Sequence, residues 1–352
     1  MSHLPHDILV NILSRLPAKS LGQFKSVCRY WFSLISSETF VKLHHHQALN
    51  DIHTNHSRIF IMSNHSMHSV DYESPACYEE GVDDDDAKGF VSLNNPLTEE
   101  AVGERLLGSC YSFIYFVCYN QCILLWNPTT QKTRLIPDPS MTDGDPFYGL
   151  GYVFSTDDYK MVRASCCISS KSISFDVFNL NIGYWKMGQA SDIDIDDPDL
   201  IEIFFNGSLN WLVRYRGDHD KRAKVLSFDM KYEIFKVTTL PDCGAFFSLG
   251  DMKGCLYAVC GGDGADMEIW VMKEYGAESS WSKVIKLNSI EFHCGYQLWP
   301  VCFTKEGDDV IIDIDSWTMV RYNLSNKTIK MFKFRGTYLH DWLVYHQTLV
   351  SS

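Results

Sequence analysis

The first 46 residues carry apolar side chains at helical intervals. Intervals of three and four residues, which predict an α-helix, separate Leu4, Ile8, Leu9, Ile12, Leu13 and Leu16. Pro5 suits a first helical turn, and Pro17 ends this helix because proline lacks the backbone N–H. A second helical pattern then follows at Leu21, Phe24, Val27, Cys28, Trp31, Leu34 and Ile35.

The apolar face of these short helices is wider than one small core requires. Adjacent pairs such as Ile8–Leu9 and Ile12–Leu13 broaden it. A wide apolar face on a small helical unit indicates that a partner covers part of it. The alternative is a helical cap that packs on the rest of the same chain, and the pattern alone leaves both open.

The next segment, residues 47–105, is weakly patterned and is interpreted as a connector with the first strands of the following domain. The run His44, His45 and His46 just before it is expected to be solvated, because three adjacent histidines on regular backbone cannot converge on one metal. The block Asp83–Asp86 repels itself and predicts an exposed loop.

From residue 106 to residue 352 the pattern is β throughout, and it repeats. The recurring unit is an apolar strand, a polar turn, and a second strand near a bulky side chain. Its copies, counted from Trp126, Phe178, Phe228, Val271 and Tyr322, are 52, 50, 43 and 51 residues apart. This spacing is typical of kelch-type propeller blades with four strands each.

Glycine hairpins support this interpretation. Asn206-Gly207 is a strong signal for a two-residue turn with positive φ at both positions, and Lys253-Gly254 and Glu306-Gly307 follow the same pattern. Five units are plain, while residues 58–62 and 342–345 could supply a sixth or close the ring, because open propeller edges would be exposed. The expected fold is therefore mostly β: short N-terminal helices followed by a kelch-like β-propeller of about six blades.

The charge of the chain is unevenly distributed. Its net charge is −13, but residues 1–46 hold five basic and two acidic side chains, a net +3, and the remainder holds 26 basic and 42 acidic ones, a net −16. An acidic body argues against nucleic acid as a partner, because binding phosphate requires a basic face. Acidity fits a basic protein partner, or it simply keeps the protein soluble.

No apolar run reaches the roughly 20 residues that a membrane helix needs, and residues 1–10 do not resemble a signal peptide. We therefore expect no membrane partner and a location in the cytoplasm or nucleus, where the twelve cysteines would be reduced and mostly buried. None forms a CxxC pair, so no metal is expected.

Candidate chemistry elsewhere is weak. Gly261-Gly262-Asp263-Gly264 is interpreted as a hairpin turn because it lacks the strand–helix context of a phosphate loop. Asp192, Asp194 and Asp196 resemble the start of a calcium loop, but Asp197 and Ile203 stand where that loop needs Gly and Glu. No nucleophile, base and oxyanion hole can be assembled, so neither an enzyme nor a cofactor is expected.

Residues 4–40, LPHDILVNILSRLPAKSLGQFKSVCRYWFSLISSETF, closely resemble the F-box motif. The match includes the Leu-Pro start, the ILSRLPAKSL centre and the VCRYW segment, and defines a domain over residues 1–46. Gly22 and Gln23 depart from the pattern, which usually has a bulky or basic pair there.

Residues 106–335 resemble the plant F-box-associated domain. LLWNPTTQKTRLIP, NGSLNWL and VLSFDMKYEIFKVTTLP look like its recurrent elements. Within that group the chain is similar both to F-box/kelch-repeat proteins and to the S-locus F-box proteins of pollen, for which the target would be a basic ribonuclease.

The resemblance implies the substrate-recognition subunit of a ubiquitin ligase, itself non-catalytic. The F-box would bind a Skp-family adaptor, and through it a cullin and a RING subunit, while the propeller would bind the target. By motif matching, the adaptor-facing set is drawn from Leu4, Pro5, Ile8, Leu9, Ile12, Leu13, Leu16, Pro17, Leu21, Phe24, Val27, Cys28 and Trp31.

Some of these residues must instead form the core of the motif, and sequence cannot divide them. An acidic stretch, Asp192, Asp194, Asp196, Asp197 and Asp199, is a weak candidate for contact with a basic target; the alternative is a solvated loop between blades. Two other functions are weighed: a propeller enzyme, which would need catalytic groups that are not found, and a non-degradative adaptor-binding scaffold.

Overall fold

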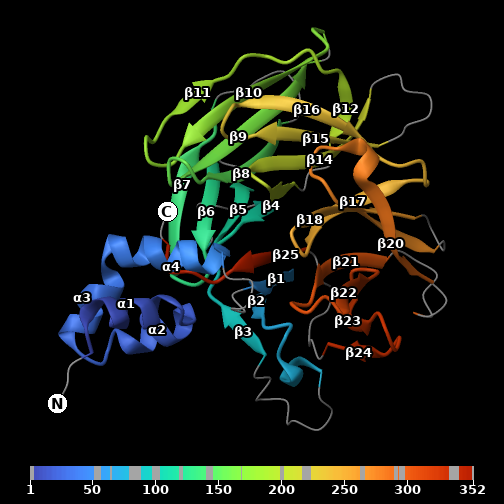
Figure 1. Ribbon diagram of the computed structural model, residues 1–352. Helices are drawn as coiled ribbons and strands as arrows, with labels where there is room; N and C mark the ends of the chain where they lie inside the picture. The colour runs from blue at the N-terminus through green and yellow to red at the C-terminus, as the bar shows by residue number, and fades with distance from the viewer. Residues whose placement is uncertain are drawn as a thin grey trace.

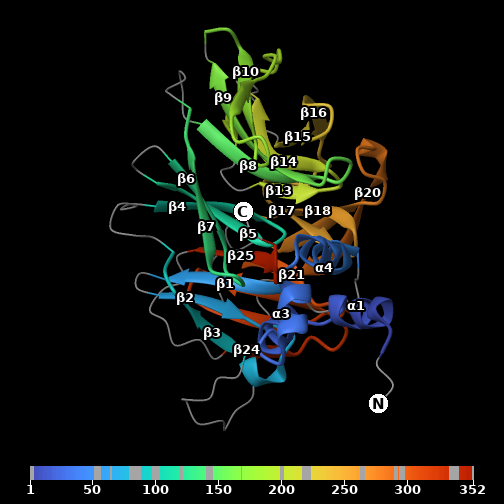
Figure 2. The same ribbon diagram turned by 90° about the vertical axis from the view of Figure 1, so that its left-hand side faces the viewer.

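The protein forms four N-terminal helices followed by a propeller of six sheets (Figures 1 and 2). The computed structural model describes residues 4–50, 57–63, 66–78, 89–96, 104–118, 122–139, 146–167, 169–198, 202–215, 223–261, 266–288, 292, 298–332 and 341–350. The helices are α1 (His6–Ser14), α2 (Ala18–Phe24), α3 (Arg29–Ser36) and α4 (Glu38–Asn50). Within the described ranges, none of the helices combines the length and apolarity needed to span a membrane.

The prolines begin helices rather than only ending them. Pro5 and Pro17 precede α1 and α2 with φ near −55° and extended ψ (−52°, 144° and −56°, 143°), conformations that suit a residue just outside a helix. The helices share a small core around Leu13, Leu21 and Ile35, to which α4 contributes Phe40.

Each blade is an antiparallel sheet. With strands given from the axis outwards, the first blade is β25 (Asp341–His346), β1 (Ser57–Ser63), β2 (Ser66–Val70) and β3 (Phe90–Leu93), and the second is β4 (Glu104–Cys110), β5 (Phe113–Cys118), β6 (Cys122–Asn127) and β7 (Lys132–Pro137). The third blade is β8 (Pro146–Val153), β9 (Asp158–Cys167), β10 (Ser172–Asn179) and β11 (Trp185–Met187), and the fourth is β12 (Ile195–Pro198) with β13 (Ile203–Phe205), β14 (Ser208–Tyr215), β15 (Lys224–Asp229) and β16 (Ile234–Thr239). The fifth blade is β17 (Phe246–Met252), β18 (Cys255–Cys260), β19 (Met267–Met272) and β20 (Trp281–Leu287), and the sixth is β21 (Leu298–Phe303), β22 (Asp309–Ile314), β23 (Thr318–Asn323) and β24 (Ile329–Met331). Among the described residues, two short 3₁₀ helices, η1 (Pro75–Cys77) and η3 (Glu278–Ser280), lie in connections.

The ring is closed by pairing the two ends of the propeller. The last strand, β25, is the innermost strand of the first blade and pairs antiparallel with β1, with Ile61 opposite Trp342. This confirms the prediction that residues 58–62 and 342–345 close the ring. Closure removes the exposed inner edge that an open propeller would present.

A repeated turn between the third and fourth strands explains the periodicity of the sequence. In four blades an Asn or Asp ends the third strand. Its side-chain oxygen accepts the N–H three residues on, its carbonyl accepts the N–H four residues on, and the donor of that second bond has positive φ. The turn residues and their partners are Asn127 and Gln131, Asn179 and Gly183, Asp229 and Glu233, and Asn323 and Lys327. Short polar side chains favour such turns because they satisfy local backbone donors.

The Asn206-Gly207 hairpin forms as predicted. The two residues have φ of +48° and +76° and connect β13 to β14, while Lys253 and Gly254 have φ of +50° and +74° between β17 and β18. Positive φ at both positions matches the right-handed twist of the flanking strands.

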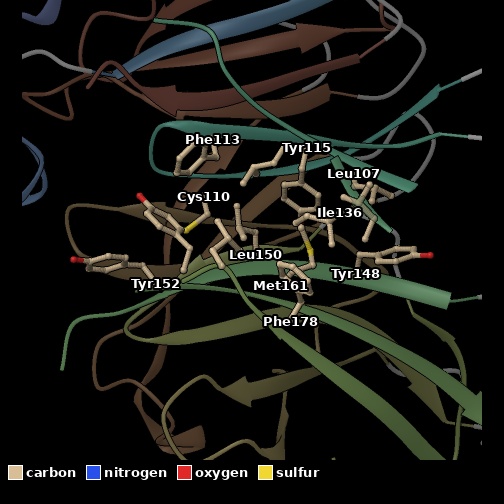
Figure 3. Close-up of a cluster of buried hydrophobic side chains, with 14 residues drawn as sticks. Leu107, Cys110, Phe113, Tyr115, Ile136, Tyr148, Leu150, Tyr152, Met161 and Phe178 are labelled. Carbon is tan, nitrogen blue, oxygen red and sulfur yellow. The ribbon is translucent and has the colours of Figure 1, made fainter. Parts of the chain in front are cut away.

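The hydrophobic core lies between neighbouring blades. Between the blades of β4–β7 and β8–β11, a cluster containing Phe113, Tyr115, Leu150 and Met161 is almost completely buried (Figure 3). Similar clusters fill the other seams. The wedge shape of each blade is thus built from large aromatic and branched side chains.

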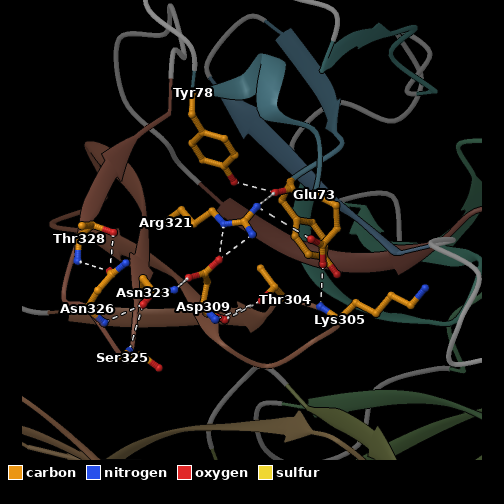
Figure 4. A network of polar contacts seen from close by, with 11 residues as sticks. Glu73, Tyr78, Thr304, Lys305, Asp309, Arg321, Asn323, Ser325, Asn326 and Thr328 are labelled. Atoms are coloured by element: carbon orange, nitrogen blue, oxygen red, sulfur yellow. Dashed lines mark hydrogen bonds and ion pairs between the residues drawn. The ribbon is translucent and has the colours of Figure 1, made fainter.

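A polar network joins the last blade to the first (Figure 4). The guanidinium of Arg321 on β23 donates to Asp309 at 2.6 and 2.7 Å, and Asp309 also accepts from Asn323. On the side of the first blade, the Arg321 guanidinium lies over the ring of Tyr78, 5.6 Å from its centroid, and Glu73 accepts the backbone N–H of Lys305. These contacts hold the connection between β2 and β3 against the last blade.

Two expectations about local structure are wrong. The histidine run is not solvated: it lies in α4, where His44 and His45 are buried. The cysteines are not all reduced, since Cys243 and Cys260 are joined as a disulfide. Both follow from long-range packing that local pattern does not record.

Candidate adaptor-binding face and its junction with the propeller

The structure divides the predicted adaptor-binding residues into two groups. Six of them pack in or against the core of the helical domain: Leu9, Leu13, Leu16, Leu21, Phe24 and Trp31. The other seven are exposed: Leu4, Pro5, Ile8, Ile12, Pro17, Val27 and Cys28. The second group is the part of the prediction that a partner could cover.

The exposed apolar residues of α1 form a stripe. Ile8 and Ile12 are four residues apart on α1, so they lie on one side of the helix, with exposed fractions of 47% and 49%. Leu4, just before the helix, is 56% exposed. A helix of a monomer normally buries such a stripe. In the described part of the chain it remains at the surface.

Two exposed aromatic residues of α3 were not in the predicted set. Tyr30 and Phe32 are each at least half exposed. The Tyr30 hydroxyl is hydrogen-bonded to the His6 ring, which places Tyr30 beside the first turn of α1. The run Tyr-Trp-Phe at 30–32 was the available signal, since Trp31 between them turns into the core. We call the exposed residues Leu4, Ile8, Ile12, Val27, Tyr30 and Phe32 the adaptor face.

Helix α4 fastens the helical domain to the propeller. His45 is 2% exposed; its Nε2 lies 3.0 Å from the Tyr159 hydroxyl, and its ring packs against Tyr111 and Tyr152. Burial lowers the pKa of His45 to about 3, with the neighbouring His46 adding to the effect. A neutral imidazole is therefore the form that fits this site at physiological pH.

A charged cluster lies at the edge of the same junction. Lys42 and His46 of α4 both contact the Asp157 carboxylate, at 3.2 and 3.1 Å, and Tyr152 donates to it. Burial opposes ionisation of Asp157, but the hydrogen bonds from Tyr152, His46 and Lys42 outweigh it and lower the pKa of the carboxyl. Asp157 sits at φ +49° in the turn between β8 and β9.

The C-terminal segment lies between the two domains. Leu349 packs against the helical core, while Val350, together with Leu49 of α4, packs against the core between two blades. Thr348 hydrogen-bonds to Ser112, and the Asn127 amide donates to the carbonyls of Thr348 and Val350. One segment thus contacts both domains, so their relative orientation is fixed by burial as well as by the covalent link.

These contacts also define the two faces of the propeller. The junction involves turns that join first to second strands and third to fourth strands, as at Asp157 and Asn127. We call this the F-box face. In antiparallel blades the remaining connections lie at the other ends of the strands, and we call that end the far face.

The acidic stretch belongs to the far face. Asp192 is exposed and Asp194 is half-buried in the connection from β11 to β12. Asp196 and Asp197 lie within strand β12, so the loop interpretation does not hold for them, and Asp199 lies outside the described residues. The stretch is therefore partly an inner strand of its blade.

Comparisons with known proteins agree with this architecture. The F-box-like family model matches residues 1–45, and that of the F-box associated beta propeller domain matches residues 58–350. F-box/kelch-repeat protein At3g23880 of Arabidopsis thaliana is 31% identical, with 81% of this chain and 79% of that protein covered. F-box protein CPR1 of the same plant is 25% identical over 95% of this chain and 85% of its own.

Among solved structures, an oligogalacturonate lyase in complex with manganese has a TM-score of 0.45 and 10% identity, covering 75% of this chain and 69% of that one. This likeness is too low to carry an inference.

The family gives the coarse role of each domain. F-box domains bind Skp-type adaptors, and F-box proteins with a propeller domain act as non-catalytic substrate receptors. The helical domain with its apolar stripe and the six-bladed ring match these two parts in order and extent. The chain belongs to the F-box proteins that carry an F-box associated beta propeller domain, as do its Arabidopsis F-box/kelch-repeat relatives.

Proposed function

We propose that this chain is the substrate-recognition subunit of a Skp–cullin–F-box ubiquitin ligase in the cytoplasm or nucleus. The observation that carries the proposal is the adaptor face: a stripe of apolar side chains left exposed on helices whose own core is already filled by Leu13, Leu21 and Ile35. A Skp-type adaptor would cover this face, and a cullin and RING subunit would follow through it.

Burying the two isoleucines of this face would contribute measurably to the affinity for an adaptor. Fully burying a large aliphatic side chain contributes roughly 1.5–3 kcal/mol. Ile8 and Ile12 are about half exposed, so each would gain roughly half of that on binding. Together they account for about 1.5–3 kcal/mol, or about a 10- to 150-fold change in affinity.

The propeller would bind the target through its far face, because the helical domain occupies the other one. Residues 47–352 carry a net charge of −16. Such a body attracts a basic protein at long range, and the acidic stretch around Asp192 would be one contact. We therefore propose a basic protein surface as the target.

The proposed mechanism needs no catalytic residue in this chain. A target on the far face would be held at a fixed distance from the ubiquitin-charged enzyme, which raises the effective concentration of its lysines. The junction at His45 and Leu349 supports this role, since a loose connection would dilute that effect.

The first experiment is co-expression with a plant Skp-type adaptor and measurement of affinity. Ile8→Asp with Ile12→Asp should weaken the complex about 100-fold, because the buried face would then hold two charges. A matched control is Leu135→Asp with Met187→Asp, which changes two exposed apolar residues on outer blade strands. The control should bind normally. Equal binding by all three proteins would refute the adaptor face.

A non-degradative scaffold would pass this binding test. Reconstitution with cullin, RING subunit and ubiquitin-charged enzyme separates the two functions. The proposal expects ubiquitin transfer that depends on Ile8 and Ile12. An intact complex without transfer to any bound protein would support the scaffold instead.

A further inference from the structure

Two cysteines far apart in sequence meet on the far face. Cys243 lies in the connection between β16 and β17, and Cys260 ends β18, 17 residues later. Their Cα atoms are 6.7 Å apart, and the sulfurs are joined as a disulfide. The backbone N–H of Gly261 donates to the carbonyl of Ala245, so the two segments are also fixed beside each other by the backbone.

A carboxylate completes the cluster. Glu268 on β19 places one oxygen so that it and the two sulfurs all lie within 4.8 Å of one another. In a tetrahedral zinc site, with bonds of about 2.3 Å to sulfur and 2.0–2.2 Å to oxygen, ligand atoms are roughly 3.5–3.8 Å apart. The three groups therefore need only small side-chain rotations to share one ion.

The carboxylate is held by a second layer of donors. Lys283 donates to one Glu268 oxygen at 3.0 Å, and the Trp270 indole N–H donates to the other at 3.3 Å. Each carboxylate oxygen has a further lone pair, so these bonds orient the group without occupying it fully. Hydrogen-bonded carboxylates of this kind are typical of metal ligands.

The surroundings supply room and charge balance. The cluster lines a depression of 750 Å³ together with Asp242 and Asp266. Two thiolates and one carboxylate carry three negative charges, which a divalent ion and the neighbouring Lys283 ammonium offset. A fourth ligand can be water or one of the two aspartates.

We propose that Cys243, Cys260 and Glu268 form a thiol-dependent site for a zinc-type divalent cation, which alternates with the disulfide. A dithiol reductant cleaves the S–S bond: two electrons and two protons pass to the two cysteines, and the reductant becomes a disulfide. The cation then binds both sulfurs and releases the two thiol protons. This inference does not depend on the proposed ligase function.

The site joins strands β18 and β19 of one blade to the β16–β17 connection, which links that blade to the preceding one. The disulfide and the metal ion would each tie residues 242–244 to the sheet, but only the metal ion would also bind Glu268. The two states therefore hold the same part of the far face in different ways.

The test uses the full-length protein with Co²⁺ as a spectroscopic probe. Reduced protein, freed of reductant, should bind one Co²⁺ per chain with a thiolate-to-cobalt charge-transfer band, and Zn²⁺ should displace it. Cys243→Ser and Cys260→Ser should each remove most of the band. Glu268→Gln should keep the band and weaken affinity about tenfold or more, and Trp270→Phe should weaken it about 10-fold.

The matched control is Cys166→Ser with Cys167→Ser, which changes two neighbouring thiols on β9. It should bind Co²⁺ like the unchanged protein. Air-oxidised protein should not bind the ion. The proposal is overturned if reduced protein shows no thiolate band, if the band survives both serine substitutions, or if the disulfide resists the dithiol. Adaptor binding, measured separately on the same variants, reports on the ligase proposal alone.

Discussion

Acidification should loosen the junction between the helical domain and the propeller through His45. The imidazole of His45 is buried against Tyr111, Tyr152 and Tyr159, and Asp157 and the histidines 44, 46 and 346 are the charged or titratable groups near it. Burial holds its pKa at about 3, whereas an exposed histidine titrates near 6.5. The docked state therefore binds fewer protons than the undocked state.

The direction and size of the pH effect on docking follow from this difference in pKa. A lowered histidine pKa stabilises docking fully above pH 6.5, and this contribution is lost as the pH falls from 6.5 towards 3. At pH 5, about 1.5 pH units below the pKa of the exposed histidine, the docked state loses about 2 kcal/mol, because each unit corresponds to about 1.4 kcal/mol. The opening equilibrium of α4 should thus shift about 30-fold towards the open state.

Hydrogen exchange of the α4 amides at pH 7.5 and pH 5 measures this equilibrium after correction for the intrinsic exchange rate. The comparison protein is His45→Gln, which stays neutral and can still hydrogen-bond to Tyr159. Protection of α4 in the unchanged protein should fall about 30-fold more than in His45→Gln. Other titrating groups act equally in both proteins. The same fall in both would refute the reasoning.

Two further predictions concern the propeller. Arg321→Gln leaves the Asp309 carboxylate without its charged partner and should lower the free energy of unfolding by about 2–3 kcal/mol in urea titrations. The control Lys186→Gln changes an exposed ion pair and should lower it by less than about 0.5 kcal/mol. Equal losses would argue against a stabilising role for the polar network between the last blade and the first. Burial raises the pKa of Glu202 to about 8, so the native state becomes less stable relative to the unfolded chain as the pH rises from 4.5 to 8. Glu202→Gln should remove this dependence and gain up to about 4 kcal/mol at pH 7.5 relative to pH 4.5; a parallel pH profile would contradict it.

Sequence patterns predicted those parts of the fold that rest on neighbouring residues. The stripe of Ile8 and Ile12 on α1 and the repeated turns at Asn127, Asn179 and Asn323 each depend on contacts within about four residues. Such contacts leave a direct periodic mark on the sequence. The six-bladed ring followed because the repeated unit cannot bury its faces alone.

The sequence predicted the candidate adaptor-binding residues as one set, but it did not separate those of the helical core from those at the surface. Leu9 and Ile8 are adjacent and equally apolar, yet Leu9 packs against the helical core and Ile8 is exposed. The division depends on how α1, α3 and α4 pack, and the same packing exposes Tyr30 and Phe32 while it turns Trp31 inwards. A pattern of hydrophobicity records that a residue is apolar, and it does not record which surface covers it.

The features that sequence reasoning missed all join distant segments. His45 looked like part of a solvated run because no neighbouring residue explains its burial; the tyrosines that cover it lie 66 to 114 residues away in the numbering, as at Tyr111 and Tyr159. Cys243 and Cys260 fit no ligand spacing, since a β-hairpin and a connection between blades, rather than a loop of fixed length, bring them together with Glu268. Spacing rules describe sites built on one local turn, where sequence distance fixes geometry. In a propeller the blades set the geometry, so residues that end different strands at the same face become neighbours whatever their separation. Pairs of chemically active residues at the strand ends of one face are therefore the positions to compare when a repeat sequence of this kind is analysed for sites.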